Sequence, residues 1–159
     1  MTSIHNLGYT SKKLYSFKSI DELPSNFSGI CEINQDIMHY LNGKLHREDG
    51  PAVEEANGNK KWYQHHQLHR IDGPACEYND NTELWYKDDK LHREDGGPAV
   101  TYPNGYQSWY VNNSLHRTDG PAVEFTNGAK HWYLNNILYG ENNDFNTQSW
   151  IHFQKSIIF

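Results

Sequence analysis

Hydrophobic and polar residues alternate over short segments through the middle of the chain, and Asn, Asp and Gly separate these segments. In one of them, Val123 and Phe125 share one face of an extended strand, while Ala122 and Glu124 share the other. Segments of about four to eight residues that are rich in β-branched and aromatic residues are typical of strands. The repeated region shows no helix-period pattern, so it is predicted to be all β.

The segments recur with a regular period. The motif Leu-His-Arg-x-Asp-Gly occurs four times, and its histidines are His46, His69, His92 and His116, at spacings of 23, 23 and 24 residues. Gly96-Gly97 replaces a single glycine and lengthens the last spacing. The same rhythm is kept by Trp62, Trp85, Trp109 and Trp132, and His39 holds the equivalent place one period earlier. The chain is therefore predicted to be a repeat array with degenerate ends.

Each unit carries two turn signals. One follows the aromatic pair and lies at Asn42-Gly43, His65-His66, Asp88-Asp89, Asn112-Asn113 and Asn135-Asn136. The other lies at Asn57-Gly58, Asp80-Asn81, Asn104-Gly105 and Asn127-Gly128. Asn, Asp and Gly tolerate the positive φ of a type I′ hairpin turn, so His65-His66 is the weakest member. We predict a mostly β fold, an antiparallel meander of stacked β-hairpins, strongly twisted because neighbouring Trp and Tyr place rings on both faces.

Two flanks differ from the repeats. We place the N-terminal flank at 1–26, the β-hairpin repeat array at 27–140 and a C-terminal helical cap at 141–159. A short helix is expected near 19–23, before Pro24. In the last segment Trp150, Phe153 and Ile157 form one apolar stripe, and Asn146 or Thr147 can cap the helix. We expect this helix to cover the open end of the sheet; a helix offered to a partner is the alternative.

Composition narrows the functional classes. The net charge is −6, from 14 basic and 20 acidic residues, which argues against nucleic-acid binding and against attraction to anionic membranes. No stretch approaches the roughly 20 apolar residues of a membrane span, so we expect no membrane association. Cys31 and Cys76 form neither a disulfide scaffold nor a metal cluster, and a reducing cytosol is the simplest compartment.

The repeated His-Arg-x-Asp set is the obvious candidate for chemistry. Each unit is expected to add two strands, so equivalent residues lie about 10 Å apart, too far to share one zinc ion. A catalytic constellation is normally one asymmetric site, and no Ser or Cys recurs beside the histidines. We therefore expect no enzyme activity, no metal and no cofactor.

Two interpretations of this set stay open. In the structural one, Asp accepts backbone N–H groups of its own turn, Arg pairs with Asp or with the next unit's Glu, and His fills the crook of the turn. In the functional one, the arginines and histidines form a cationic stripe that receives a phosphate-bearing ligand or an acidic partner. The candidate binding residues are His69, Arg70, Asp72, His92, Arg93, Asp95 and Arg117, with His65 and His66 from the irregular turn.

The units, such as KLHREDGPAVEEANG from Lys44, resemble MORN-type repeats. They look closer still to the LHRxDGPA repeats of proteins of tailed phages and giant viruses, over about 30–140. The resemblance implies a hairpin array that acts as a scaffold or binding surface, without a reaction. It leads us to expect a phage or viral protein of the host cytoplasm that binds a host or viral protein, with interference with a host defence factor as one role. The alternative is a small-ligand binder that sequesters a nucleotide or another anion, and a homodimer is possible in either case.

Overall fold

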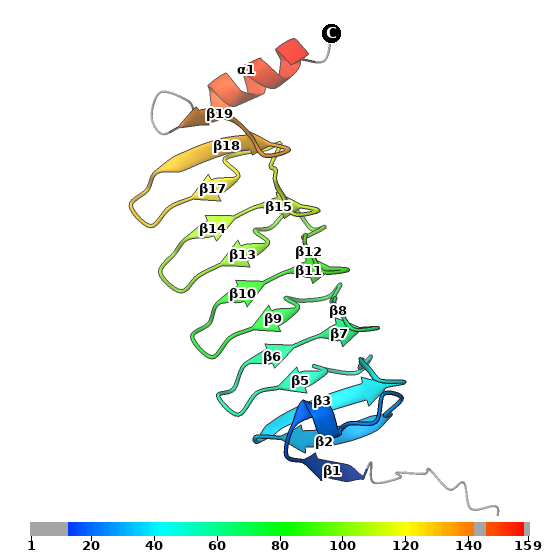
Figure 1. The fold of residues 1–159 in the computed structure, drawn as a ribbon. Helices are drawn as coiled ribbons and strands as arrows, with labels where there is room; N and C mark the ends of the chain where they lie inside the picture. The colour runs from blue at the N-terminus through cyan, green and yellow to red at the C-terminus, as the bar shows by residue number, and fades with distance from the viewer. Residues whose placement is uncertain (1–12, 142–145, 158–159) are drawn as a thin grey trace, which may run out of the picture.

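The computed structural model describes residues 13–141 and 146–157, and within them the chain forms a long ladder of short strands (Figure 1). One main sheet of 13 strands runs the whole length in the order β1-β2-β3-β5-β6-β9-β10-β13-β14-β17-β18-β19, with β4 paired to β3. All pairs are antiparallel except β1 with β2. The predicted mostly β meander of stacked hairpins, with a C-terminal helix, is confirmed.

The N-terminal end consists of β1 (Leu14–Phe17), the 3-10 helix η1 (Ile20–Glu22), β2 (Gly29–Ile33), β3 (Asp36–Leu41) and β4 (Lys44–Leu45). The rest of the main sheet consists of β5 (Val53–Glu54), β6 (Lys60–Lys61), β9 (Cys76–Glu77), β10 (Glu83–Leu84), β13 (Val100–Thr101), β14 (Gln107–Ser108), β17 (Val123–Glu124), β18 (Lys130–Leu134) and β19 (Ile137–Glu141). The short helix near 19–23 is confirmed in place as η1. Strand β1 of the N-terminal flank, which the sequence analysis does not predict, joins the sheet beside β2.

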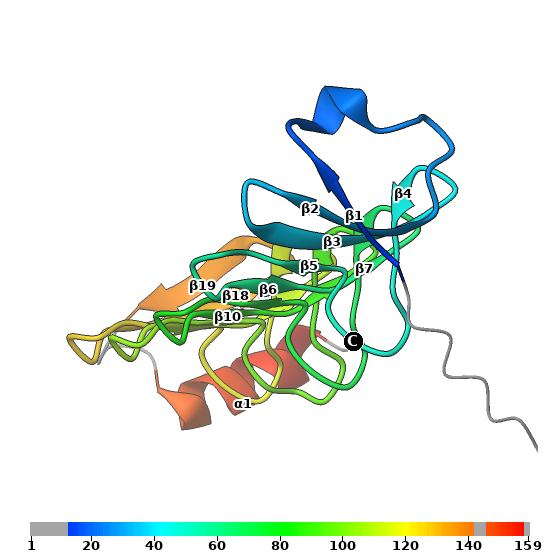
Figure 2. The ribbon, with the colours of Figure 1, turned by 90° about the horizontal axis from the view of Figure 1, so that it is seen from below.

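Each regular unit also forms a second hairpin outside the main sheet. These hairpins are β7 (Tyr63–Gln64) with β8 (Gln67–Leu68), β11 (Tyr86–Lys87) with β12 (Lys90–Leu91), and β15 (Tyr110–Val111) with β16 (Ser114–Leu115). They stack in a column along one margin of the main sheet, at an angle to it (Figure 2). A unit therefore adds two strands to the main sheet, as expected, and two more to this column.

Hairpin turns form where the Asn and Asp pairs predict them. Both central residues of the turn have positive φ at His65 and His66 (52° and 74°), as at Asn112 and Asn113 (49° and 65°). Positive φ at both positions is the signature of a type I′ turn. The imidazole pair therefore adopts the same backbone conformation as its Asn counterparts, although Asn visits this conformation more readily.

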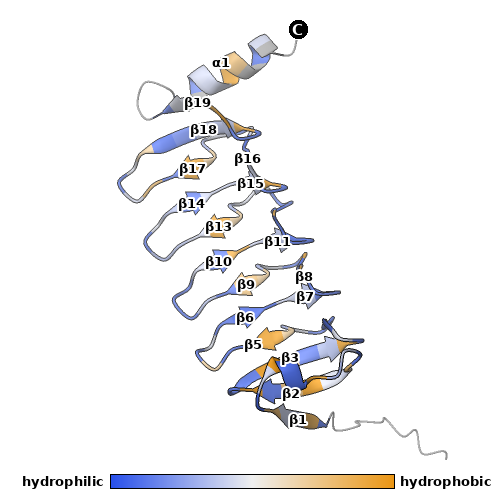
Figure 3. Ribbon diagram, viewed as in Figure 1, coloured by the Kyte–Doolittle hydropathy of each residue, from blue (hydrophilic) through white to orange (hydrophobic). Residues whose placement is uncertain are grey.

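The core is a thin line of small side chains. Ala52, Ala75, Ala99 and Ala122 are fully buried, each one residue before a buried Val53, Cys76, Val100 or Val123 on the opposite face. Figure 3 shows hydrophobic colour in β5, β13 and β17, and hydrophilic colour in β6 and β14 between them. From β5 to β17 the axes of the antiparallel strands stay nearly aligned with one another (Figure 1). The strong twist that was expected to shield the aromatic rings is not seen over these strands. The tryptophan rings are covered instead by the loops described below.

Helix α1 (Thr147–Ile157) closes the C-terminal end of the array. Asn146 is its N-cap, because its Oδ1 accepts hydrogen bonds from the backbone N–H groups of Gln148 and Ser149, both at 3.0 Å. Trp150 is fully buried, and its Nε1–H donates to the carbonyl of Thr118 at 2.9 Å. Phe153 packs on Tyr139, with ring centroids 4.8 Å apart. The predicted capping role is confirmed for these residues; the Ile157 side chain lies outside the described part.

Candidate functional site

The His-Arg-x-Asp-Gly motifs form loops on one side of the main sheet, the side on which α1 lies (Figure 2). We call these loops, residues 46–50, 69–73, 92–97 and 116–120, the loop edge. Each loop leads from a short hairpin back into the main sheet. Its Arg extends back under the loop toward the tryptophan eight residues earlier in the chain.

Arg70, Arg93 and Arg117 are each held between a tryptophan and a glycine, whereas Arg47 Nη1 lies 3.1 Å from Nε2 of His39. The guanidinium carbon of Arg70 lies 4.0 Å from the ring centroid of Trp62, and Arg93 and Arg117 lie 3.9 and 4.0 Å from Trp85 and Trp109. On the other side, a Cβ at Gly73 would lie 2.5 Å from the Arg70 Cζ atom. Glycine therefore follows Asp in the motif because any larger residue at this position would collide with the stacked guanidinium.

The guanidinium groups also donate several hydrogen bonds to groups of the same unit. In the second unit, Arg70 Nε donates to Asp72 Oδ1 at 3.1 Å, and Nη1 donates to Glu77 Oε1 at 2.7 Å and to the Pro74 carbonyl at 3.2 Å. The first and fourth units repeat this set around Arg47 and Arg117. Arg pairs with the Glu of its own unit, not of the next one, so the expected inter-unit pair is corrected.

The aspartates that pair with the arginines are much more exposed to solvent than the arginines themselves. The Arg70 side chain is 21% exposed, whereas that of Asp72 is 87% exposed. Because each of Arg47, Arg70 and Arg117 faces two carboxylates, the loop edge is not an open cationic stripe. Its surface is a row of acidic side chains beside half-buried arginines that they neutralise.

The third unit departs from this scheme. Thr101 stands where the other units have Glu54, Glu77 and Glu124, so Arg93 pairs with Asp95 alone, through Nε at 2.6 Å and Nη2 at 3.0 Å. Asp95 also accepts the backbone N–H of Gly97, the turn bond that the structural interpretation predicts. These hydrogen bonds, with that from Arg93 first, hold the pKa of Asp95 below its usual range. A hollow of about 310 Å³ between the second and third loops is lined by Arg70, Trp85, Lys87, His92 and Arg93 together with Glu94 and Asp95.

The motif histidines join successive units. His46 Nδ1 accepts the backbone N–H of His65 at 3.2 Å, and His92 Nδ1 accepts that of Asn112 at 3.3 Å. His69 Nδ1 lies 2.7 Å from Asp88 Oδ1, and His116 Nδ1 lies 2.9 Å from Asn135 Oδ1. Every motif histidine thus contacts the hairpin turn of the next unit, rather than the crook of its own turn as expected.

The irregular His65-His66 turn takes part in the same contacts. The His65 ring lies 4.7 Å from the His46 ring, and His66 Nδ1 accepts the Leu45 backbone N–H at 3.4 Å. In the following units an Asp or Asn oxygen accepts the corresponding bond at 2.7 to 2.8 Å. The candidates His65 and His66 therefore lie at the junction with Leu45 and His46, whereas His69 contacts Asp88 at the next junction. Arg70 and Asp72 pair with each other within their loop, and the partners of all five belong to the fold.

The described residues offer little for metal or thiol chemistry. Among them, no three His, Cys, Asp or Glu side chains are placed to hold a metal ion. Both cysteines are buried and free, and burial raises the pKa of the Cys76 thiol to about 11. A thiol held protonated in this way is a poor nucleophile. Within residues 13–141 and 146–157, no helix has the length and apolar character needed to cross a bilayer.

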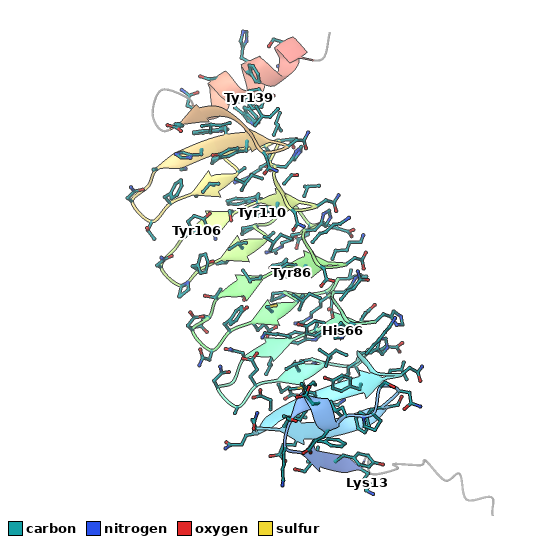
Figure 4. The ribbon with its side chains drawn as sticks, viewed as in Figure 1. Lys13, His66, Tyr86, Tyr106, Tyr110 and Tyr139 are labelled. Atoms are coloured by element: carbon teal, nitrogen blue, oxygen red, sulfur yellow. The ribbon has the colours of Figure 1, made fainter. Side chains whose placement is uncertain are left out.

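The opposite side of the sheet carries tyrosines. Because Trp62 faces the loops, the next residue, Tyr63, faces away from them, on the side of Cys76 and its cross-strand partner Lys61. One such tyrosine occurs in each unit, and the column is Tyr63, Tyr86, Tyr110 and Tyr133, all half-buried. A second column nearer the Asn-Gly turns is Tyr78, Tyr102 and Phe125. We call these seven residues the tyrosine face; Figure 4 shows Tyr86 and Tyr110 one after the other along the array.

Toward the C-terminal end the second column becomes a continuous aromatic cluster. Tyr106 lies between Tyr102 and Phe125, with ring centroids 5.5 and 5.7 Å away, and Phe125 contacts His131 at 4.8 Å. In the first unit an ion pair between Glu55 and Lys61 occupies the corresponding place. Tyr106, which breaks the repeat pattern, therefore extends the tyrosine face.

The first column presents hydrogen-bond donors. Burial raises the pKa of Tyr63, Tyr86 and Tyr110, so these phenols are protonated at neutral pH. Within the described residues, the hydroxyls of Tyr63 and Tyr86 have no hydrogen-bonding partner. These tyrosines are not among the candidates predicted from the sequence, although a Tyr follows every Trp of the repeat.

The chain matches no family model, and no curated protein is significantly similar to it. The resemblance to MORN-type and viral LHRxDGPA repeats therefore stays a prediction, as do the viral origin, the host-defence role and the cytoplasmic location that it implies. The function is therefore inferred from the contrast between the loop edge and the tyrosine face.

Proposed function

We propose that this chain is a non-enzymatic protein-interaction module that binds its partner on the tyrosine face. The observation that carries the proposal is the contrast between the two sides of the sheet. On the loop edge the polar groups bond to each other, whereas the tyrosine face repeats a half-exposed ring in every unit. Tyrosine combines a large apolar surface with a polar tip and is enriched in protein interfaces.

The alternative, an anion held by the arginine loops, has one supporting feature. Arg93 has one carboxylate fewer than its counterparts, because Thr101 replaces Glu. However, Thr101 lies directly opposite Glu83 in the sheet register, and Asp95 already holds Arg93 through two nitrogens. An incoming anion would meet these two carboxylates, so we favour the tyrosine face.

Site-specific photo-crosslinking tests the proposal in the cells that naturally contain the protein. A benzophenone amino acid replaces Tyr102, which is 42% exposed on the tyrosine face, or Ile71, which is 73% exposed on the loop edge. We expect one protein, identified by mass spectrometry, to crosslink from position 102 and not from position 71. The same protein should bind the purified chain in a stoichiometric complex that Tyr86→Ser weakens. Crosslinking from position 71 alone, or from neither position, would overturn the proposal.

A further inference from the structure

The first tyrosine column has a period that the sheet dictates. Tyr63, Tyr86 and Tyr110 occupy equivalent places in successive units, and each unit adds two strands to the main sheet. Neighbouring strands lie about 4.8 Å apart, so successive tyrosines recur about every 9.6 Å along the array. Any chain that uses all of them must repeat its own contacts at that interval.

A polyproline II helix has nearly this repeat. It rises about 3.1 Å per residue with three residues per turn, so every third residue returns to the same side after about 9.3 Å. The mismatch is about 0.3 Å per unit, or roughly 1 Å from the first tyrosine to the fourth. An α-helix returns after seven residues at about 10.5 Å, a drift three times larger. In a β-strand, the third residue along points to the opposite side.

The hydroxyl groups and rings of the first tyrosine column also suit a bound segment in the polyproline II conformation. A polyproline II backbone makes no internal hydrogen bonds, so its carbonyls are free acceptors. The hydroxyls of Tyr63 and Tyr86 are donors without a partner among the described residues. Tyrosine rings also offer flat apolar surfaces to proline rings, which is how aromatic-lined receptors recognise such segments. A segment that is already extended loses little conformational entropy on binding.

We propose that the tyrosine face binds a proline-rich segment of the partner in the polyproline II conformation, running along the array with every third residue against one tyrosine of the first column. This inference rests on the proposed function, because it names the kind of partner that the tyrosine face binds. In this arrangement the segment lies on the first column, and the second column, which includes Tyr102 and Phe125, lies beside it on the side of the Asn-Gly turns.

Fluorescence anisotropy with a labelled dodecaproline peptide tests the inference on the full chain. We expect saturable binding that the double variant Tyr86→Ser, Tyr110→Ser weakens at least about tenfold, because two of the four ring contacts are lost. The pair Tyr86→Phe, Tyr110→Phe keeps the rings and should weaken binding only a few-fold. Ile71→Ser, a matched surface change on the loop edge, should leave the affinity unchanged. Circular dichroism checks that each variant is folded.

Two peptides of equal length test the register. One carries proline at every third position in a glutamine background, (Pro-Gln-Gln)₄, and the other at every fourth position, (Pro-Gln-Gln-Gln)₃. We expect the first to bind several-fold more tightly, because only a three-residue repeat returns to successive tyrosines. Equal binding of the two peptides would contradict the proposed register.

The outcomes separate this inference from the function on which it rests. If dodecaproline fails to bind at millimolar concentration while position 102 still crosslinks to a partner, the polyproline inference is wrong and the interaction module stands. If the Ile71→Ser variant loses peptide binding and the tyrosine variants keep it, the tyrosine face is the wrong surface, and both proposals fail.

Discussion

At the scale of single residues, the arginine of the motif joins several parts of its own unit. Arg70 stacks on Trp62, leaves room only for a glycine on its other side, and pairs with Asp72 and Glu77. The planar guanidinium is what allows stacking and several directed hydrogen bonds at once. The motif Arg-x-Asp-Gly therefore describes one packing unit, which explains why all its polar residues recur together.

The substitution Arg70→Ala should lower the free energy of unfolding by about 2 kcal/mol, since it uncovers Trp62 and leaves two carboxylates unopposed. Arg70→Lys should recover less than half of this loss, because an ammonium group cannot stack and bridge in the same way. Urea unfolding measures both. The control Ile71→Ser, next in sequence and exposed, should change stability by less than about 0.5 kcal/mol. A loss below that value for Arg70→Ala would show that the packing unit is not stabilising.

The ion pair of the first unit gives a pH-dependent prediction. The hydrogen bond from Lys61, with further bonds from Asn59 and Asn57, lowers the pKa of Glu55. A lowered carboxyl pKa stabilises the fold above the pKa of the unfolded chain, and this contribution is lost as the pH falls through the folded value. Glu55→Gln should therefore cost about 1 kcal/mol at pH 7, and this cost should shrink as the pH falls below the unfolded value of roughly 4.3 and through the lower folded pKa. A cost that is independent of pH in urea titrations would contradict this assignment.

At the scale of elements, the hairpin turns are where sequence and structure agree best. All five predicted turns of the first kind have positive φ at both central residues. In the last two regular turns, the second Asn accepts the backbone N–H of a leucine in the preceding unit at 2.7 Å. The turn residues therefore serve both their own hairpin and the junction to the unit before.

His66 is the least suited residue in this role, and replacing it should stabilise the fold. In His66→Asn the amide oxygen takes the place of Nδ1, which lies 3.4 Å from the Leu45 nitrogen, and Asn tolerates positive φ better than His. We expect a gain of about 0.5 kcal/mol in the free energy of unfolding at pH 7. The same change at an exposed site outside a turn, His152→Asn, serves as the control. A loss of stability in His66→Asn would show that the imidazole has a role that the turn geometry does not explain.

The division of each unit between two sheets could not be predicted from the alternation of residues. Adjacent Trp and Tyr indicate opposite faces, but they do not reveal that the chain turns a corner between Trp62 and Tyr63 to start a hairpin outside the main sheet. For a related reason, the sequence left two interpretations of the His-Arg-x-Asp set open. The sequence shows Arg beside Asp, whereas the stacking on a tryptophan eight residues away appears only once the loop is folded back on the sheet.

At the scale of the whole molecule, each unit contacts only its neighbours along the array. The contacts of His46, His69 and Leu45 all reach the next unit and no further. The two ends depart from the regular pattern, with β1 and η1 at one end and α1 at the other. In such an array, stability is approximately a sum over units and junctions.

A whole unit should therefore be removable. Deleting residues 67–89, one period, joins His66 to Lys90 in the register of the native turn. We expect a folded protein with one cooperative urea transition and an m-value reduced roughly in proportion to chain length. Deleting residues 67–84 removes part of a unit, breaks the register and should abolish the transition. Equal behaviour of the two deletions would contradict the modular description.

The most direct test of the account is an amide NMR titration of the full chain with dodecaproline. The account predicts that shift changes concentrate in the residues around Tyr63, Tyr86 and Tyr110, in register from one unit to the next. The loops 69–73 and 92–97 should stay unchanged. Shift changes confined to those loops would place binding on the arginine motifs, and the tyrosine face would then be only part of the fold.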